Sequence, residues 1–210
     1  MNSETDHRQS ALSTVAEEVQ QCQRCGLAKT RTKAVPGEGP AGARIVFIGE
    51  APGFHEDQQG RPFVGPAGTL LEEMLGFIGC KRNQVYIANV VKCRPPMNRD
   101  PLPTEIGACE EYLERQLAAI KPLLIVTLGR FSMARYFPSQ SISKIHGIPR
   151  RGDGVIYYPV YHPAAALHQP SLCQVLEADF RKIPRIMGEA RTAFEAVPQV
   201  EQPPEQMKLL

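Results

Sequence analysis

The sequence predicts an α/β fold in which a parallel sheet is covered by helices on both faces. Three short runs, 44–49 (RIVFIG), 85–91 (VYIANVV) and 123–129 (LLIVTLG), are almost entirely apolar, and a fourth follows at 155–163 (VIYYPVYHP). Apolar strands that alternate with amphipathic helices are typical of parallel sheets buried on both sides. We therefore expect the functional site at the carboxyl ends of these strands.

The predicted helices follow the same order along the chain. The first is amphipathic, because its apolar positions lie three or four residues apart: Leu12, Val15, Val19 and Cys22. Helices are also expected at 69–79, at 104–120 and, after the last strand, at 172–188. Together these elements form one domain over residues 1–189. From residue 190 the sequence is rich in proline, glutamine and glutamate, which predicts a flexible tail over 190–210.

The composition argues against a membrane-spanning protein and says little more about function. The sequence has no apolar run long enough to cross a bilayer and no basic-then-apolar leader at its N-terminus. We therefore expect a soluble, cytoplasmic protein that has no membrane partner, and we expect a monomer because no interface signature is present. The formal net charge of +2 permits nucleic-acid binding without predicting it, because a local basic patch matters more than the total.

The cysteines suggest a metal site. Cys22 and Cys25 form a CxxC pair, Cys93 opens the loop after the second strand, and Cys109 lies on the next helix. In a reducing cytoplasm metal binding or burial is the default for cysteine, and four thiolates suit either an iron–sulfur cluster or structural zinc. The alternative is that they are buried apolar residues, which we favour for the two unpaired cysteines, Cys80 and Cys173.

Three longer segments carry a resemblance to a known family: GEAPGFHEDQQGRPFVGPAGTLLEEML (49–75), NVVKCRPPMNRDPLP (89–103) and VYHPAAAL (160–167). With the four cysteines, they resemble the family 4 uracil-DNA glycosylases, the iron–sulfur members of the uracil-excising superfamily. The resemblance implies a three-layer α/β/α sandwich around a central four-stranded parallel sheet, and removal of uracil from DNA in base excision repair. It also implies a structural [4Fe–4S] cluster on Cys22, Cys25, Cys93 and Cys109.

A glycosylase flips the base out of the stack and stabilises a cleavage in which the sugar becomes cationic and the base leaves as an anion. Glu50, at the end of the first strand, matches the residue that faces the sugar cation and orients the attacking water. The backbone N–H groups of Ala51 and Gly53 can donate to a uracil oxygen, and Phe63 offers a stacking surface. The alternatives are a surface glutamate and a core phenylalanine.

Asn89 and His162 match the residues that read the base. The Asn89 amide offers a donor and an acceptor that fit uracil O4 and N3–H and reject cytosine, whereas an asparagine capping a turn is the alternative. His162 would donate to uracil O2 as negative charge develops there, although a lone histidine is usually structural. Glu56 and Asp57 share the loop of Glu50, and in the family this acidic pair contributes to the site.

Basic and apolar side chains beside the motifs predict contacts to DNA. Four are basic and predict salt-dependent binding to phosphates: Arg61, Lys92, Arg94 and Arg99. Ordinary solvated charge is the alternative for each. Leu167, in a loop expected at 163–170, would fill the space that the flipped base leaves. His146 and His168 stand where relatives often have arginine, which weakens the expected phosphate contacts near neutral pH.

One other function fits the sequence: a non-catalytic iron–sulfur or zinc module that binds uracil-containing or damaged DNA. Glu50 discriminates, because a pure binding protein has no use for a carboxylate under the sugar. The loop after the second strand lacks the histidine and the insert with which a related group captures the abasic sugar, so free product release is expected. At the C-terminus, QMKLL (Gln206–Leu210) resembles the peptide by which bacterial repair proteins dock on the sliding clamp, although such short matches also arise by chance.

Overall fold

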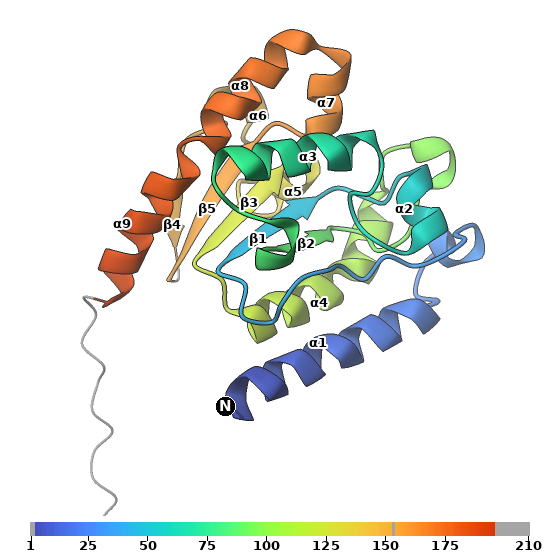
Figure 1. Ribbon diagram of the computed structural model, residues 1–210. Coiled ribbons are helices and arrows are strands. Elements are labelled where there is room, and N and C mark those ends of the chain that lie inside the picture. Colours follow the sequence, from blue (N-terminus) through green and yellow to red (C-terminus); the bar gives the residue numbers. More distant parts are fainter. Residues whose placement is uncertain (1–2, 153, 196–210) are drawn as a thin grey trace, which may run out of the picture.

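The computed structural model describes residues 3–152 and 154–195, and there a five-stranded sheet lies between two layers of helices (Figure 1). The strands are β1 (Ile45–Gly49), β2 (Tyr86–Asn89), β3 (Leu124–Leu128), β4 (Arg150–Gly152) and β5 (Val155–Val160). Their order in the sheet is β2-β1-β3-β5-β4, and β2, β1, β3 and β5 run parallel. The predicted α/β class and the four predicted strands are confirmed.

The expected strand number is one too low. β4 pairs antiparallel with β5, with Arg151 opposite Ile156, and extends the sheet by a short edge strand. Arg150 and Arg151 are exposed, so this strand carries no apolar run that sequence patterning would detect. It exists because β5 offers it a free edge next to a tight turn.

One face of the sheet is covered by α3 (Pro66–Phe77), α7 (Pro163–His168), α8 (Pro170–Phe180) and α9 (Ile183–Glu195) (Figure 1). Phe47 on β1 stacks on Phe180 of α8, with ring centroids 5.7 Å apart. Leu71 of α3 and Ile87 of β2 are fully buried in the same apolar cluster. The alternate side chains of each strand therefore face this layer.

The other face is covered by α4 (Pro103–Ile120), and α1 (Ser3–Gln21) packs on α4 in turn (Figure 1). Val19 of α1, Leu113 of α4, and Val46 and Ile48 of β1 belong to this second buried cluster. Because successive residues of β1 enter the two clusters alternately, every residue of that strand is buried. This explains why the strand has no polar alternation in the sequence.

The remaining short helices lie in the connections. They are η1 (Gly26–Lys29), α2 (Phe54–Gln59), η2 (Arg82–Gln84), η3 (Pro96–Asn98), α5 (Arg130–Ala134) and α6 (Ile142–Ile145). Figure 1 shows α2 and the connections that follow β1 and β2 at the carboxyl edge of the sheet. The loops that carry the motifs therefore meet at the edge where a site was expected.

The C-terminal part differs from prediction. The single helix expected at 172–188 is two helices, α8 and α9, and Pro184 lies in the first turn of α9, where its missing N–H costs nothing. α9 continues to Glu195, and Ala190 is fully buried, so residues 190–195 are helical, and residues 196–210 of the predicted tail lie outside the described residues. The clamp peptide at Gln206–Leu210 lies outside the described residues and stays a prediction. In the part of the chain that the structure describes, no helix has the length and apolarity needed to cross a membrane.

Candidate active site

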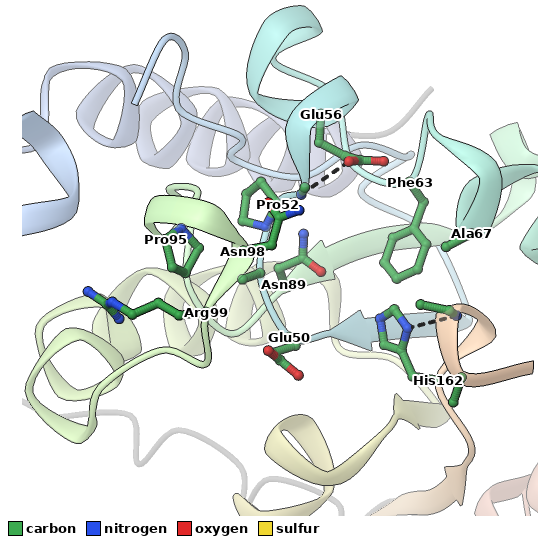
Figure 2. A pocket seen from close by; sticks show the side chains of 14 residues that line it. Glu50, Pro52, Glu56, Phe63, Ala67, Asn89, Pro95, Asn98, Arg99 and His162 are labelled. Atoms are coloured by element: carbon green, nitrogen blue, oxygen red, sulfur yellow. Dashed lines mark hydrogen bonds between the residues drawn. The ribbon is translucent and has the colours of Figure 1, made fainter. Parts of the chain in front are cut away.

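A cavity of about 350 Å³ lies at the carboxyl ends of β1, β2 and β5 (Figure 2). Most of the residues predicted for catalysis and base binding line it, together with Arg99: Glu50, Ala51, Gly53, Glu56, Phe63, Asn89, Arg99 and His162. Two of the predicted residues follow a strand directly or end it, Glu50 after β1 and Asn89 at the last position of β2. The parallel sheet thus brings together side chains that are far apart in the sequence.

Asn89 is the most informative residue of this cavity. Its side chain is 1% exposed, and neither its amide nitrogen nor its amide oxygen has a hydrogen-bond partner. Asn89 pairs in register with Gly49, where an added Cβ would lie 2.4 Å from the Asn89 oxygen, so only glycine permits this approach. A buried amide without partners is costly, and this one faces the cavity, where a ligand can supply both a donor and an acceptor.

His162 has a defined tautomer. Its Nδ1 accepts a hydrogen bond from the backbone N–H of Ala164 at 3.1 Å (Figure 2). Burial lowers the pKa of His162 to about 4, although Glu56 opposes the shift. The ring is therefore neutral at pH 7, and because Nδ1 is the acceptor, Nε2 carries the proton. The imidazole is a hydrogen-bond donor on the cavity.

Phe63 forms a wall of the cavity beside this histidine. The two rings stack with centroids 5.5 Å apart and an interplanar angle of 28°. Phe63 has a φ of 50°, which is unusual for a residue other than glycine. Phe63 is 5% exposed and belongs to the buried cluster that contains Leu71, and it also lines the cavity, so it is both a core residue and a wall of the site.

Glu50 brings a carboxyl group to the same space (Figure 2). Burial raises the pKa of Glu50, the negative charge of Asp100 raises it further, and Arg130 opposes both. A carboxylate that is partly withdrawn from water interacts more strongly with a nearby positive charge than one in solvent does. The surface-glutamate alternative is not consistent with this half-buried position.

Glu56 and Asp57 have separate tasks. Glu56 Oε1 accepts from the backbone N–H groups of Val64 and Gly65 at 2.9 Å each, and Oε2 accepts from Gly53 N at 3.1 Å. This carboxylate therefore ties together the two ends of the loop that surrounds the cavity. Asp57 is buried on the other side of α2, where Oδ1 accepts from the backbone N–H of Thr32 at 2.9 Å. The structure does not bring Asp57 to the cavity.

The prediction that Lys92 contacts DNA is wrong. Its side chain is 1% exposed, and Nζ donates to the Asn89 carbonyl oxygen at 2.9 Å and to Gln116 Oε1 at 2.7 Å. Burial lowers the pKa of Lys92 to about 8. An enclosed ammonium cannot reach a phosphate, and here it fixes the backbone at the end of β2.

The three arginines are at the surface but differ in their partners. Arg61 donates twice to the carboxylate of Glu38, at 2.7 and 2.8 Å. Arg99 lines the cavity and forms two bonds to the buried carboxylate of Glu105, at 2.9 and 2.7 Å. Arg94 donates to the Asn98 side-chain oxygen at 2.7 Å and lies over the ring of Phe54. Arg94, which is bound only to neutral groups among these contacts, is the best placed of the three for a phosphate.

Leu167 is 48% exposed, as a residue that contacts DNA must be. It lies on the short helix α7, whereas a loop was expected there. His168 is exposed at the end of the same helix. His146 faces inward instead, with Nδ1 2.6 Å from Oδ2 of the buried Asp179. His146, which stands where relatives often have arginine, therefore binds a buried carboxylate of the fold and is not part of the surface expected to contact DNA.

The rest of the cavity lining was not predicted. It consists of Pro52, Ala67, Pro95, Asn98, Ala164 and Ala165. All of them lie in the three segments that carry the family resemblance, so the segments were the available signal. Which of their residues face the cavity depends on the turns between the strands and the short helices, and no sequence periodicity marks these positions.

The four cysteines of the predicted metal site lie together at one corner of the molecule, which we call the cysteine corner. Cys93 and Cys109 are buried in the cluster shared by α1 and α4, and Cys22 and Cys25 pack against it. The thiols are close enough to interact electrostatically, Cys93 with Cys22 and Cys25, and Cys109 with Cys93 and Cys22. Cys80 and Cys173 are partly buried against the other core cluster, as expected for apolar residues.

Three of the four sulfur atoms in this corner already accept hydrogen bonds from N–H groups. Arg31 Nη1 donates to Cys93 Sγ at 3.0 Å, the backbone N–H of Lys92 to Cys109 Sγ at 3.2 Å, and that of Arg24 to Cys22 Sγ at 3.5 Å. N–H donors and a nearby guanidinium stabilise sulfur that carries negative charge. The all-sulfur donor set and its hydrogen bonds fit a thiolate-bound metal group.

A sequence model of the Uracil DNA glycosylase superfamily matches residues 36–183, the span that contains the sheet and the cavity. The chain therefore belongs to the uracil-DNA glycosylase superfamily.

Within it, the relatives at 41–50% identity are type-4 uracil-DNA glycosylases, and type-5 members match at 30–34% identity. The chain is 48% identical over 187 residues to the type-4 uracil-DNA glycosylase of Archaeoglobus fulgidus, with 85% of this chain and 94% of that protein covered. It is 50% identical over 183 residues to the type-4 protein of Sulfurisphaera tokodaii, with 82% and 83% covered. The type-4 protein of Thermotoga maritima is 45% identical over 169 residues, with 78% and 87% covered. The resemblance seen in the motifs is confirmed over most of the chain.

Proposed function

We propose that this protein removes uracil from DNA by hydrolysing the N-glycosidic bond, which leaves an abasic site for base excision repair. Membership of the superfamily and similarity to type-4 members support this activity. The observation that carries it is the buried Asn89 amide without protein partners on a cavity at the strand ends. A structural asparagine would use its hydrogen bonds within the protein.

Asn89 selects uracil through the order of its two polar groups. The amide nitrogen donates to uracil O4 and the amide oxygen accepts from N3–H. Cytosine presents a donor where uracil has O4 and an acceptor where uracil has N3–H, so both contacts would become unfavourable. Because the amide is buried, water cannot take over the lost bonds, and the penalty for cytosine is large.

Glu50 and His162 act on the charges that form as the bond breaks. The C1′–N1 bond breaks with its electron pair leaving on uracil, the water oxygen bonds to C1′, and the proton that this water loses neutralises the uracil anion. The Glu50 carboxylate stabilises the cationic sugar and orients the water, and Nε2–H of neutral His162 donates to uracil O2 as negative charge develops. Phe63 supplies the surface on which the base stacks.

DNA contacts surround this cavity. Leu167 on α7 fills the space left by the flipped base, and Arg94 and Arg99 on the connection after β2 bind phosphates. Arg61 adds positive charge to this DNA-binding surface while its guanidinium is bound to Glu38. The product is released freely, since the connection after β2 holds no histidine that could capture the sugar.

The cysteine corner would hold a [4Fe–4S] cluster through Cys22, Cys25, Cys93 and Cys109. When bound, the cluster supplies a cross-link between the segment after α1, the connection after β2, and α4. Zinc is the second candidate for the same four thiolates, since both groups accept an all-sulfur ligand set. Among residues 3–152 and 154–195, no three His, Cys, Asp or Glu side chains are grouped as ligands of a metal ion.

The test uses a labelled oligonucleotide with one uracil, single-stranded or paired with guanine or adenine, and alkali to reveal abasic sites. Wild-type protein is expected to cut at uracil, and Glu50→Gln and Asn89→Ala are expected to cut poorly. A matched oligonucleotide with cytosine controls for specificity. If wild-type protein binds the uracil oligonucleotide and leaves the base attached, the non-catalytic binding module replaces the glycosylase.

A further inference from the structure

The wall of the cavity contains a strained residue that must be held in place. Phe63 adopts a φ of 50°, in the left-handed region that disfavours side chains other than glycine. Such a conformation persists only where the surroundings determine it. Two sets of contacts do so here, one on each side of the Phe63 peptide group.

On one side is Arg82, a residue of η2 that does not line the cavity. Its Nη1 donates to the carbonyl oxygen of Phe63 at 2.9 Å, and its Nη2 donates to the carbonyl oxygen of Pro62. The guanidinium therefore bridges two successive carbonyl groups. Its side chain is 14% exposed, so these bonds compete little with water.

The guanidinium is itself held by carboxylates. Arg82 Nε donates to Glu38 Oε1 at 3.1 Å, and Glu72 lies 3.4 Å from Nη1. Hydrogen bonds from Arg61 and Arg82 lower the pKa of Glu38, although burial opposes them. Glu38 is thus charged at neutral pH and fixes the plane of the Arg82 side chain.

On the other side are Glu56 and Gly68. Glu56 accepts from the N–H groups of Val64 and Gly65, the two residues after Phe63. A Cβ at Gly68 would lie 2.0 Å from the Phe63 carbonyl oxygen, so α3 begins in direct contact with this peptide group. Arg82 is the charged side chain that binds the carbonyl oxygens of this turn.

We propose that Arg82 is a positioning residue for base binding: by bridging the carbonyl groups of Pro62 and Phe63, it holds the Phe63 ring where the flipped base stacks. The inference rests on the proposed function, since it concerns the same site. It assigns a role to a residue outside the three motif segments. Lysine cannot replace arginine here, because its single nitrogen lacks the planar fork by which three separate Arg82 nitrogens reach two successive carbonyl groups and Glu38.

The test compares Arg82→Lys, which keeps the charge, with Glu72→Gln, which removes a contact to Arg82 but leaves both carbonyl bonds. The readouts are the inhibition constant of free uracil, the single-turnover excision rate, and affinity for a duplex without uracil. We expect Arg82→Lys to raise the inhibition constant and to slow excision, each by about tenfold, as partial loss of base stacking predicts. Glu72→Gln should match wild type, and affinity for the uracil-free duplex should be unchanged in both.

A double-mutant cycle with Phe63→Ala separates positioning from general support of the fold. If Arg82 acts through the ring, Arg82→Lys has no further effect on uracil inhibition once Phe63 is alanine. Additive effects, or a uracil inhibition constant equal to wild type in Arg82→Lys, overturn the inference. Should Arg82→Lys not fold, Glu38→Gln tests the same bridge. This variant is expected to raise the inhibition constant of uracil by less than tenfold, and an unchanged inhibition constant would count against the inference. Wild-type protein that neither excises uracil nor is inhibited by it overturns the proposed function itself.

Discussion

The strand-end cavity and the cysteine corner differ in whether their polar atoms already have hydrogen-bond partners in the protein. In the cavity, both polar atoms of the buried Asn89 amide lack partners. In the corner, three of the four sulfur atoms already accept N–H groups. The first arrangement suits a ligand that comes and goes, because the protein keeps its hydrogen bonds free. The second suits a permanent group that is part of the folded state. Changes in the cavity should thus cost activity and changes in the corner should cost stability.

The largest effect is expected for Cys93→Ser. Cys93 is buried, and its sulfur accepts from Arg31, so the variant should lose bound iron and more than about 5 kcal/mol of unfolding free energy, as for other structural metal sites. Iron analysis, the visible absorbance of the purified protein and chemical denaturation measure this. Cys80→Ser is the matched control and should keep iron and stability. Equal iron content in both variants would contradict the assignment of the four ligands.

Glu50→Gln should lower single-turnover excision by about 10³-fold, as removal of a preorganised electrostatic group does, and leave the unfolding free energy nearly unchanged. In the proposed mechanism the carboxylate form of Glu50 is the active one. The rate should therefore fall with decreasing pH through a pKa above that of an ordinary glutamate, since burial, and then Asp100, raise the pKa of Glu50.

Asp100→Asn sharpens this pH test. Removing the negative charge of Asp100 should lower the pKa of Glu50 and move the acid limb of the rate profile to lower pH. An acid limb that stays in place in Asp100→Asn, or one that persists in Glu50→Gln, would show that another group controls the rate.

The buried His162 ring of the cavity should make the unfolding free energy depend on pH. Its pKa is about 4 in the folded protein and about 6.5 in the unfolded chain, so between these values the unfolded state binds more protons. The stabilisation is complete above pH 6.5 and is lost as pH falls to 4, by about 3 kcal/mol. Denaturant titrations of wild type and His162→Asn at several pH values isolate this difference. A constant difference across this range would mean that the buried ring is not neutral in the fold.

Asn89→Ala gives the sharpest contrast between the two regions, because it should lower activity without lowering stability. The expected loss of activity is smaller than for Glu50→Gln. Excision of uracil should drop by about 10²-fold, since the two contacts to the base edge are removed. The melting temperature should stay the same or rise, because no hydrogen bond within the protein is lost. A marked fall in melting temperature would show that the amide supports the fold, and the contrast between the regions would fail.

The sequence by itself determined the class of fold, the family and most of the cavity. The strands are apolar throughout because both faces are buried, so β1, β2, β3 and β5 could be found in order. The polar side chains that the structure brings to the cavity from strand ends lie in the motifs, so Glu50, Asn89 and His162 could be named from sequence.

Tertiary structure alone decided what each polar side chain contacts. Lys92 looked like a phosphate ligand beside the motif, but α4 provides Gln116 as its buried partner. Asp57 stands next to Glu56 in sequence, yet successive residues of a helix point in different directions, and only Glu56 reaches the cavity. Arg82 could not be found from any motif, since its partners Glu38 and Phe63 are joined to it only by the fold. The physical reason is the same in each case: hydrogen-bond partners distant in sequence are set by packing, which no local pattern records.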